Sequence, residues 1–422
     1  MRLKWVIMGL SLVLVGLLIN PAIGELIPKA QLGKSIFFDM DLSINKNQSC
    51  ATCHAPEVGW TGPDSYLNAH GTVYEGSIPG RFGDRKPPSS AYATMSPIFI
   101  MNKKGLFIGG NFWDGRATGE KLGNPAADQA QGPFLNPKEQ ALPDSACVVH
   151  RVCTASYPVS FGEVWGLEAC NISWPADVDA VCATEGTTVS LSIEDRDKSD
   201  MTYDKIALSI AAYEASEEVN AFSSKFDLTF ISGKNKAKLT KEEQIGGALF
   251  WGKGKCAKCH SFGGKAALFT DFTFDNLGLP QNPESPAGTA PDFLDPGLGG
   301  FLKNAGYEED VYLAEWGKHK VPTLRNVDLR PYPEFVKAYG HNGYFKSLEG
   351  IVHFYNTRDV KPECPGTYTE VEALAADCWP APEVSENVNR DELGDLGLSA
   401  EEEAAIVAFL KALSDGYQIP VE

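Results

Sequence analysis

The chain has 422 residues, of which 43% are hydrophobic and 22% charged, so it can bury a sizeable core and is not expected to be disordered. Its 37 basic residues are outnumbered by 55 acidic ones, which gives a formal net charge of −18. This balance argues against nucleic-acid binding, which needs a basic surface, and favours charged partners that carry positive patches. The length suggests two or three domains.

The N-terminal segment has the features of a secretory signal. Arg2 and Lys4 form a basic start, residues 6–19 are apolar, and small residues at 22 and 24 suit cleavage after Gly24. An uncleaved membrane anchor is the alternative. We expect residues 1–24 to be a signal peptide and the rest to be exported, to the periplasm or beyond, without stable membrane insertion. Loss of Arg2 and Lys4 would take the formal charge from −18 to −20.

Two parts of the chain repeat one pattern. Residues 32–38 predict an amphipathic helix and are followed by a C-x-x-C-H motif at residues 50–54. Residues 245–251 predict a similar helix, begun by a Thr240–Glu243 capping box, and are followed by a second C-x-x-C-H motif at residues 256–260. The six motif residues are Cys50, Cys53, His54, Cys256, Cys259 and His260.

The C-x-x-C-H spacing has a chemical reason. Two thiols about one helical turn apart can add to the two vinyl groups of one haem, and the histidine that follows can ligate its iron. A thioredoxin-like dithiol needs no such histidine, and a zinc site needs four close ligands. The sequence therefore predicts two c-type haems, one at each motif.

The six other cysteines are expected to form disulfides, because their number is even and the chain is expected to be exported. Free buried thiols are the alternative. Pairing of sequence neighbours is the simplest arrangement among 15. The bonds would then be Cys147–Cys153, Cys170–Cys182 and Cys364–Cys378. Residues 140–200 and 362–388 hold these cysteines and several Pro and Gly residues, and both are interpreted as disulfide-stapled loop insertions.

Two further helices are predicted in the rest of the chain. Residues 201–222 carry a helical stripe that we expect to bridge the domains, and Ser399 with Glu402 begins a last helix that ends before Gly416. No sustained β alternation is present. The predicted fold is mainly α, with two cytochrome-c-like helical domains that each hold one covalent haem. The expected limits are residues 25–200, including the insertion 140–200, and residues 201–422, including the insertion 362–388.

Additional motifs give the chain a family resemblance. Residues 112–116 read F-W-D-G-R, residues 321–327 read V-P-T-L-R-N-V, and residues 129–139 contain a Q-A-x-x-P-x-x-N-P-x-E segment. Further matches are His341-Asn342-Gly343 and the segments 347–349 and 354–356. With the two haem motifs, the chain resembles the bacterial di-haem cytochrome c peroxidases and their relative MauG, the enzyme that matures methylamine dehydrogenase. The resemblance implies a first haem, on His54, that reacts with peroxide.

The resemblance also implies roles for residues around the first haem. Glu139 matches the acid–base group that moves a proton between the peroxide oxygens, and Gln129 and Pro133 line the same pocket. By composition alone, Glu139 would be a solvated loop carboxylate. Trp113 matches a tryptophan between the haems, whereas a core tryptophan is the alternative.

Propionate binding is a further implied role. Arg116 is expected to hold a haem propionate. His341 either does the same or is a core histidine.

The second haem, on His260, is implied to be six-coordinate and to pass electrons. Family peroxidases use a methionine as its sixth ligand and MauG uses a tyrosine. No methionine follows Met201, and Tyr355 falls at the ligand position, with His353 as the rival. A phenolate stabilises ferric and higher oxidation states, so Tyr355 would lower the reduction potential of this haem.

Two further positions bear on the resemblance. His70 lies where some family peroxidases carry a histidine that blocks the first haem, although an ordinary loop histidine is the alternative. The family also binds calcium between its domains, through carbonyls near Lys320 and Pro322 and an asparagine side chain. Lys86 stands at the asparagine position, and an ammonium cannot ligate calcium, so calcium is in doubt.

Three functions follow from these features. The first is an exported peroxidase that reduces hydrogen peroxide with electrons from a small donor such as a cytochrome c. The second is a MauG-like enzyme that uses peroxide to reach a high-valent di-haem state and oxidises Tyr or Trp side chains of a partner protein. The third, a non-catalytic electron carrier, would not need Glu139. Tyr355 favours the second function over the first.

Overall fold

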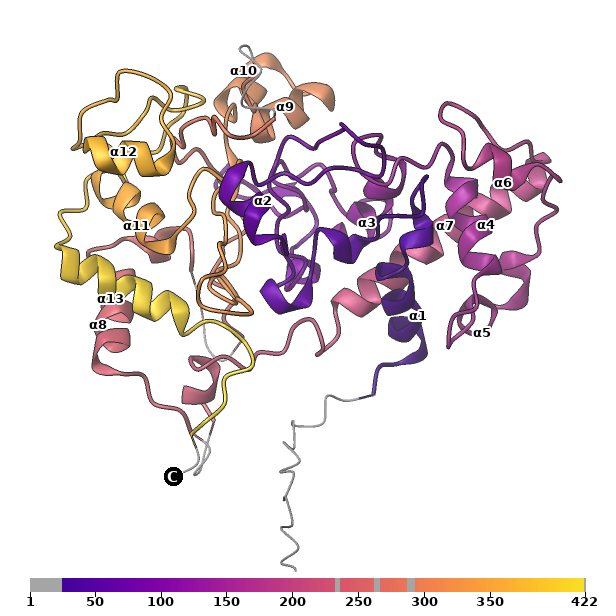
Figure 1. The fold of residues 1–422 in the computed structure, drawn as a ribbon, viewed down its shortest axis with the longest axis horizontal. Helices are drawn as coiled ribbons and strands as arrows, with labels where there is room; N and C mark the ends of the chain where they lie inside the picture. The colour runs from indigo at the N-terminus through magenta and orange to yellow at the C-terminus, as the bar shows by residue number, and fades with distance from the viewer. Residues whose placement is uncertain (1–24, 232–235, 262–265, 287–292, 421–422) are drawn as a thin grey trace, which may run out of the picture.

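A computed structural model describes residues 25–231, 236–261, 266–286 and 293–420 (Figure 1). The expected signal peptide lies outside these residues. The described chain is mainly helical, as predicted, and none of its helices is both long and apolar enough to cross a membrane.

The first half of the chain forms one hydrophobic core. Leu32, Phe134, Val149 and Ile210 lie in this core and belong to four different helices. The helices of this half are α1 (Pro28–Phe37), α2 (Ser65–His70), α3 (Pro125–Leu135), α4 (Ser145–Thr154), α5 (Phe161–Trp165), α6 (Val178–Val181) and α7 (Ile193–Glu214).

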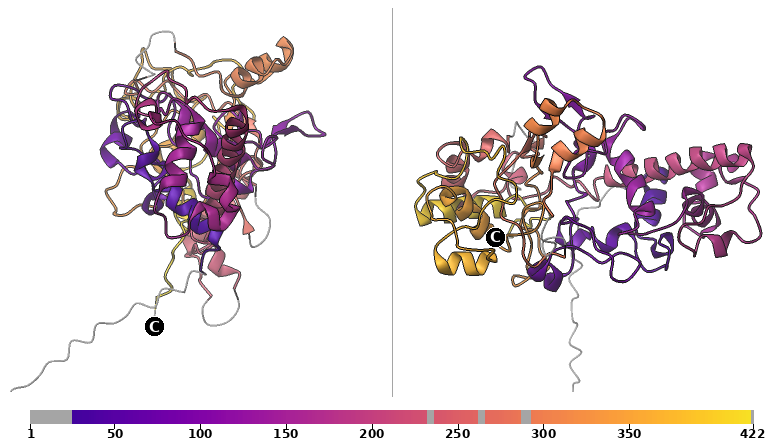
Figure 2. Two further views of the ribbon diagram at one scale, coloured as in Figure 1. Left: turned by 90° about the vertical axis from the view of Figure 1, so that its right-hand side faces the viewer. Right: turned by 90° about the horizontal axis from the view of Figure 1, so that it is seen from above.

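The second half forms a separate core around residues such as Phe250, Phe354 and Phe409. Figures 1 and 2 show α8, α11, α12 and α13 gathered at the opposite end of an elongated molecule from α4, α5 and α6. The helices are α8 (Lys241–Trp251), α9 (Gly297–Asn304), α10 (Glu309–Ala314), α11 (Leu348–Thr357), α12 (Glu370–Ala376) and α13 (Ala400–Lys411).

The sequence repeat corresponds to a structural repeat. Helix α1 packs on α7, and α8 packs on α13 in the same way. A glycine lies at each crossing: a Cβ atom on Gly33 would lie 1.8 Å from the carbonyl oxygen of Ser209, and one on Gly246 would lie 1.8 Å from that of Ala405. Glycine is therefore required at both positions, because any side chain would collide with the facing backbone.

Helix α7 begins earlier than predicted and does not act as a bridge. It starts at Ile193, where the Ser192 side chain accepts a hydrogen bond from the Asp195 amide, and it packs on α1, α3 and α4 of the first core. A domain boundary at residue 200 would cut this helix.

Short strands and single turns complete the fold. Strand β1 (Ile100–Met101) pairs antiparallel with β2 (Phe107–Ile108), and β3 (Phe274–Asp275) pairs antiparallel with β4 (His319–Lys320). The two sheets lie close together, because Phe99 and Phe107 share a small core with Phe274. Short 3-10 helices span Met40–Leu42, Pro56–Val58, Ala93–Met95, Leu167–Cys170 and Asp227–Thr229.

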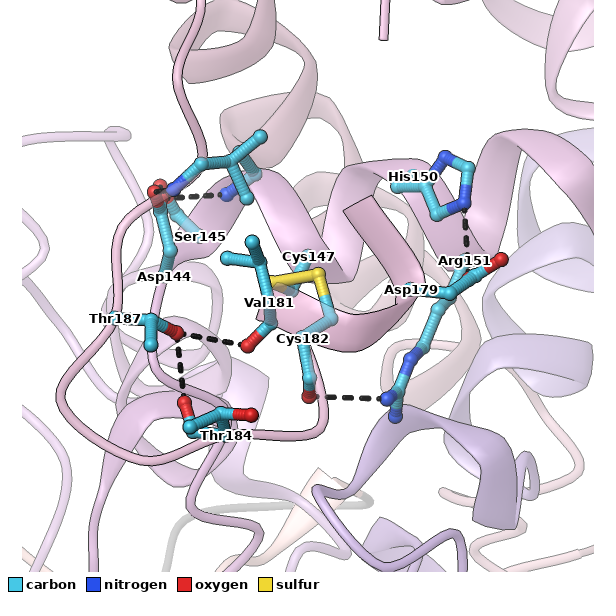
Figure 3. Close-up of a disulfide and its surroundings, with 12 residues drawn as sticks. Asp144, Ser145, Cys147, His150, Arg151, Asp179, Val181, Cys182, Thr184 and Thr187 are labelled. Atoms are coloured by element: carbon cyan, nitrogen blue, oxygen red, sulfur yellow. Dashed lines mark hydrogen bonds and ion pairs between the residues drawn. A yellow bond between two sulfur atoms is a disulfide. The ribbon is translucent and has the colours of Figure 1, made fainter. Parts of the chain in front are cut away.

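The predicted disulfide pairing is wrong for two of the three bonds. Cys147 bonds Cys182 (Figure 3), and Cys153 bonds Cys170, while the predicted Cys364–Cys378 bond is confirmed. Cys147 and Cys153 both belong to α4 and are six positions apart, which corresponds to a rise of about 9 Å along the helix axis. A disulfide spans at most about 7 Å between Cα atoms, so this pair cannot bond.

The segment 140–200 is also not a loop insertion. Its helices α4, α5 and α6 contribute Val148, Val149, Val152, Phe161 and Val178 to the first core. The two disulfides join α4 to Cys182 at the end of α6 and to the 3-10 helix Leu167–Cys170, so the segment is a helical extension of the core. The segment 362–388 contains α12 within a largely irregular loop.

Candidate active site

The two C-x-x-C-H motifs adopt one local structure. Each begins with a 3-10 turn, Cys50–Thr52 in the first and Cys256–Lys258 in the second. The histidine amide then donates to the first cysteine carbonyl, at 3.0 Å in His54 and 2.9 Å in His260. All four motif thiols are unpaired, although the six other cysteines form disulfides.

Both motif histidines are oriented as metal ligands. Nδ1 of His54 lies 3.2 Å from the carbonyl oxygen of Trp60, and Nδ1 of His260 lies 2.9 Å from that of Phe269. Donation from Nδ1–H to these carbonyls leaves each Nε2 lone pair free for a metal. Burial lowers the pKa of both imidazoles, to about 4 for His54, which favours the neutral form that ligates.

A cavity of about 520 Å³ adjoins the first motif. Helix α3 places Gln129 and Pro133 one turn apart on its wall, and the chain then folds back to bring Glu139 to the same cavity. The Glu139 carboxylate accepts a hydrogen bond of 3.1 Å from Nδ2 of Asn136. Burial raises the pKa of Glu139, while Arg116 and Asn136 oppose the rise. The predicted residues Cys50, Cys53, His54, Gln129, Pro133 and Glu139 thus share one cavity.

A cavity of about 210 Å³ adjoins the second motif. Cys256, Cys259 and His260 line it, and Tyr355 of α11 also faces it. His353, the rival ligand, is not among the lining residues; its Nδ1 lies 3.1 Å from the carboxylate of Glu403. The arrangement favours Tyr355 over His353.

Trp113 lies in the wall between the two cavities and lines both. Its indole N–H donates to the Lys86 carbonyl at 2.8 Å, and its own carbonyl accepts from the Lys320 amide at 2.8 Å. These two bonds fix the tryptophan from both sides.

Arg116 and His341 also have defined partners. Nη1 of Arg116 donates to Asp114 at 2.7 Å, and Arg116 lines the first cavity. His341 lines the second cavity, stacks on His319 at 3.5 Å between ring centroids, and lies 3.3 Å from Glu383.

His70 is placed away from the first cavity. It ends α2, is exposed, and its ring stacks on Tyr66 with a centroid distance of 4.3 Å. His70 is not among the residues that line the cavity. The geometry favours the ordinary surface histidine.

Sequence reasoning missed a buried charged network in the wall. Arg85 binds both carboxylate oxygens of Asp295, at 2.6 and 2.7 Å, and also Asp114 at 2.6 Å. Asp295 lies 3.3 Å from His319. Glu214 of α7 was missed as well: it lines the first cavity, and burial raises its pKa to about 8. Asp114 belongs to the F-W-D-G-R motif, but no local motif marks Arg85, Asp295 or Glu214, whose surroundings come from distant segments.

Comparison with known proteins identifies the family. The family model "Di-haem cytochrome c peroxidase" matches residues 28–236. The methylamine utilization protein MauG of Paracoccus denitrificans is 32% identical over 397 residues, with 92% of this chain and 88% of that protein covered. This chain belongs to the di-haem cytochrome c peroxidase/MauG family.

Other relatives carry peroxidase names. Cytochrome-c peroxidase IdrP1 of Denitromonas iodatirespirans is 26% identical, covering 92% of this chain and 81% of that protein. The diheme peroxidase BthA of Burkholderia thailandensis superposes with a TM-score of 0.71 at 26% identity, covering 93% of this chain and 87% of that chain. Membership in this family implies two c-type haems and an oxidoreductase that uses hydrogen peroxide. The two motifs fit these haems, because their free thiols and oriented imidazoles face cavities.

Proposed function

We propose that the protein reduces hydrogen peroxide in the cavity beside His54, with electrons that enter through the second site at His260. The observation that carries this proposal is the placement of Glu139, Gln129 and Pro133 in the cavity that Cys50, Cys53 and His54 also line. A haem held there would supply a redox-active iron. A plain electron carrier would not need a carboxyl group in such a cavity.

The residues of the first cavity account for the proton chemistry. Reduction of hydrogen peroxide consumes two electrons and two protons and gives two water molecules. The Glu139 carboxylate can take the proton from one peroxide oxygen and return it to the other. Asn136 holds the carboxylate by its hydrogen bond, and Gln129 offers an amide to orient the peroxide.

Trp113 provides the connection between the two sites. It lines both cavities, and hydrogen bonds hold both its indole N–H and its main-chain carbonyl. A fixed aromatic ring at this position shortens the distance that an electron has to cross between the cavities. Electrons from a cytochrome c would enter at the second site.

A second candidate function is the oxidation of Tyr or Trp side chains of a partner protein. Tyr355 in the second cavity and the 32% identity to a MauG favour it. An anionic phenolate ligand stabilises oxidised iron and makes electron uptake from a cytochrome less favourable. Under this function Trp113 would carry oxidising equivalents toward the partner.

One experiment separates the two functions. The diferric holoprotein is titrated with peroxide, and its spectrum is followed with and without reduced cytochrome c. Rapid oxidation of the cytochrome with stoichiometric loss of peroxide supports the peroxidase. A long-lived oxidised state that ignores the cytochrome supports protein oxidation. A spectrum that does not respond to peroxide contradicts both.

The location of the protein is part of the proposal. Three disulfides form and persist in oxidising compartments, and c-type haem attachment is expected outside the cytoplasm. Together with the N-terminal signal features, they support a periplasmic enzyme. Two cytochrome-like domains, divided after α7, complete the proposed organisation.

A further inference from the structure

Lysine side chains line the two cavities and the wall between them. Lys86 and Lys320 line both cavities, as Pro322 does, and Lys337 lines the second. These include the positions that match the calcium ligands of the family, where Lys86 had already put calcium in doubt. The structure therefore brings those positions together, but with ammonium groups among them.

Each ammonium group is surrounded by neutral oxygens. Nζ of Lys320 donates to Ser96 Oγ at 2.6 Å, to Asn111 Oδ1 at 3.2 Å and to the carbonyl of Gly110. Ser96 Oγ itself donates to Gly110, so it accepts from the lysine. Three acceptors use three N–H bonds, which the ammonium form has and the neutral amine lacks, and these bonds oppose the burial that lowers the pKa of Lys320 to about 7.

The other two lysines have similar surroundings. Nζ of Lys337 donates to the carbonyls of Val58, Asn326 and Leu329 at 2.7, 3.0 and 2.9 Å. Nζ of Lys86 donates to Thr61 Oγ1 and to the Pro87 carbonyl, both at 3.1 Å. Carbonyl and hydroxyl oxygens of this kind are the ligands that calcium takes in proteins. Here they bind lysine ammonium groups.

The carboxylates of the wall are also engaged. Asp295 and Asp114 both bind Arg85, and Asp114 binds Arg116 as well. Calcium sites combine six to eight oxygens and usually include carboxylates. Both described aspartates of this wall are therefore already paired with arginine.

We infer that the ammonium groups of Lys86 and Lys320 take the place of a calcium ion in the wall and that the protein binds no calcium ion there. Lys86 excludes the ion in two ways: it has no side-chain oxygen to offer, and its ammonium repels a divalent cation. The cationic groups of this wall are thus lysine side chains of the polypeptide, which a chelator cannot remove.

The test measures metal content and does not depend on turnover. The holoprotein is dialysed against EGTA, analysed by plasma mass spectrometry, and then titrated with calcium chloride by calorimetry and by its Soret spectrum. We expect far less than one calcium ion per chain, no binding heat and an unchanged spectrum. One calcium ion per chain, lost to EGTA with a spectral change, would overturn the inference.

Variants test the role of Lys86 directly. Lys86→Asn removes the ammonium and supplies an oxygen, and it should bind close to one calcium ion per chain. Lys86→Met removes only the charge and should bind none. Lys104→Asn, on an exposed turn, is the matched control. Both haems must remain attached in each variant, and a folded Lys86→Asn protein without calcium affinity would contradict the inference.

Discussion

Glu139 is the residue on which the proposed proton transfer depends. Its carboxyl group lies in the first cavity and has Asn136 as its hydrogen-bond donor. Glu139→Gln keeps the shape but cannot take up a proton, so peroxide cleavage should slow by on the order of 10²–10⁴. Stopped-flow mixing of the diferric protein with peroxide measures the rate. Glu120→Gln, an exposed control, should react like the wild type; unimpaired kinetics in Glu139→Gln would exclude the role.

Tyr355 is the proposed sixth ligand of the second site. Tyr355→Phe removes the phenolate oxygen, so the spectrum of one haem should change and its reduction potential should rise. Spectroelectrochemistry of the variant gives both quantities. Tyr339→Phe is a matched control, because Tyr339 lines the same cavity from a different segment. If only the control changes the spectrum, Tyr355 is not the ligand.

Some residues of the candidate site could be predicted from the sequence, and others could not. The motif residues at 50–54 and 256–260 were predictable, because covalent attachment to one haem fixes their spacing. The charged network of the wall was not predictable from the sequence. Arg85 binds Asp295, which is 210 residues away, and Lys337 binds the carbonyl oxygen of Val58. Such pairs are set by packing, and no local pattern encodes them.

The two helix crossings, of α1 with α7 and of α8 with α13, predict how single substitutions change the free energy of unfolding. A methyl group on Gly33 or Gly246 would lie 1.8 Å from a backbone carbonyl oxygen. Backbone atoms cannot move aside as a side chain can, so Gly33→Ala should lower the free energy of unfolding by about 1–3 kcal/mol or more. Gly246→Ala should do the same in the other half.

Urea unfolding of the holoprotein, followed by tryptophan fluorescence, measures this loss. Gly83→Ala is the control, because a Cβ atom there meets no atom within 4 Å. Equal stability of Gly33→Ala and Gly83→Ala would show that the α1–α7 crossing is looser than described.

Elements with strong local signals were predicted well. Thr240 and Ser399 begin α8 and α13 through capping boxes, as the sequence indicates. Helices α4, α5 and α6 were missed, because their four cysteines led us to interpret the segment as disulfide-stapled loops. The start of α7 was missed because residues 193–200 are mostly charged and hide the helical period. Disulfide pairing failed because nearness in sequence does not give nearness in space within one helix.

At the scale of the whole molecule, cations inside the protein are paired, and the excess of acidic residues is expected on the surface. The cationic groups of Arg85, Lys320 and Lys337 bind oxygen atoms inside the protein, which belong to a carboxylate, a hydroxyl or carbonyls. The whole chain has a formal charge of −18, or −20 without Arg2 and Lys4, so its surface is expected to be negative. A partner approaches this negative surface, whereas peroxide, which is uncharged, does not respond to it.

This charge predicts how salt affects the two halves of the reaction. A basic cytochrome c should be attracted over distances that salt screens, since the Debye length falls from about 30 Å at 0.01 M to about 8 Å at 0.15 M. Its second-order oxidation rate should therefore fall about tenfold or more across this range. An acidic cytochrome c should react more slowly at low salt and gain with added salt. The reaction with peroxide alone should stay constant, so a stopped-flow salt series that slows both steps equally would show that salt acts on the protein and not on the encounter.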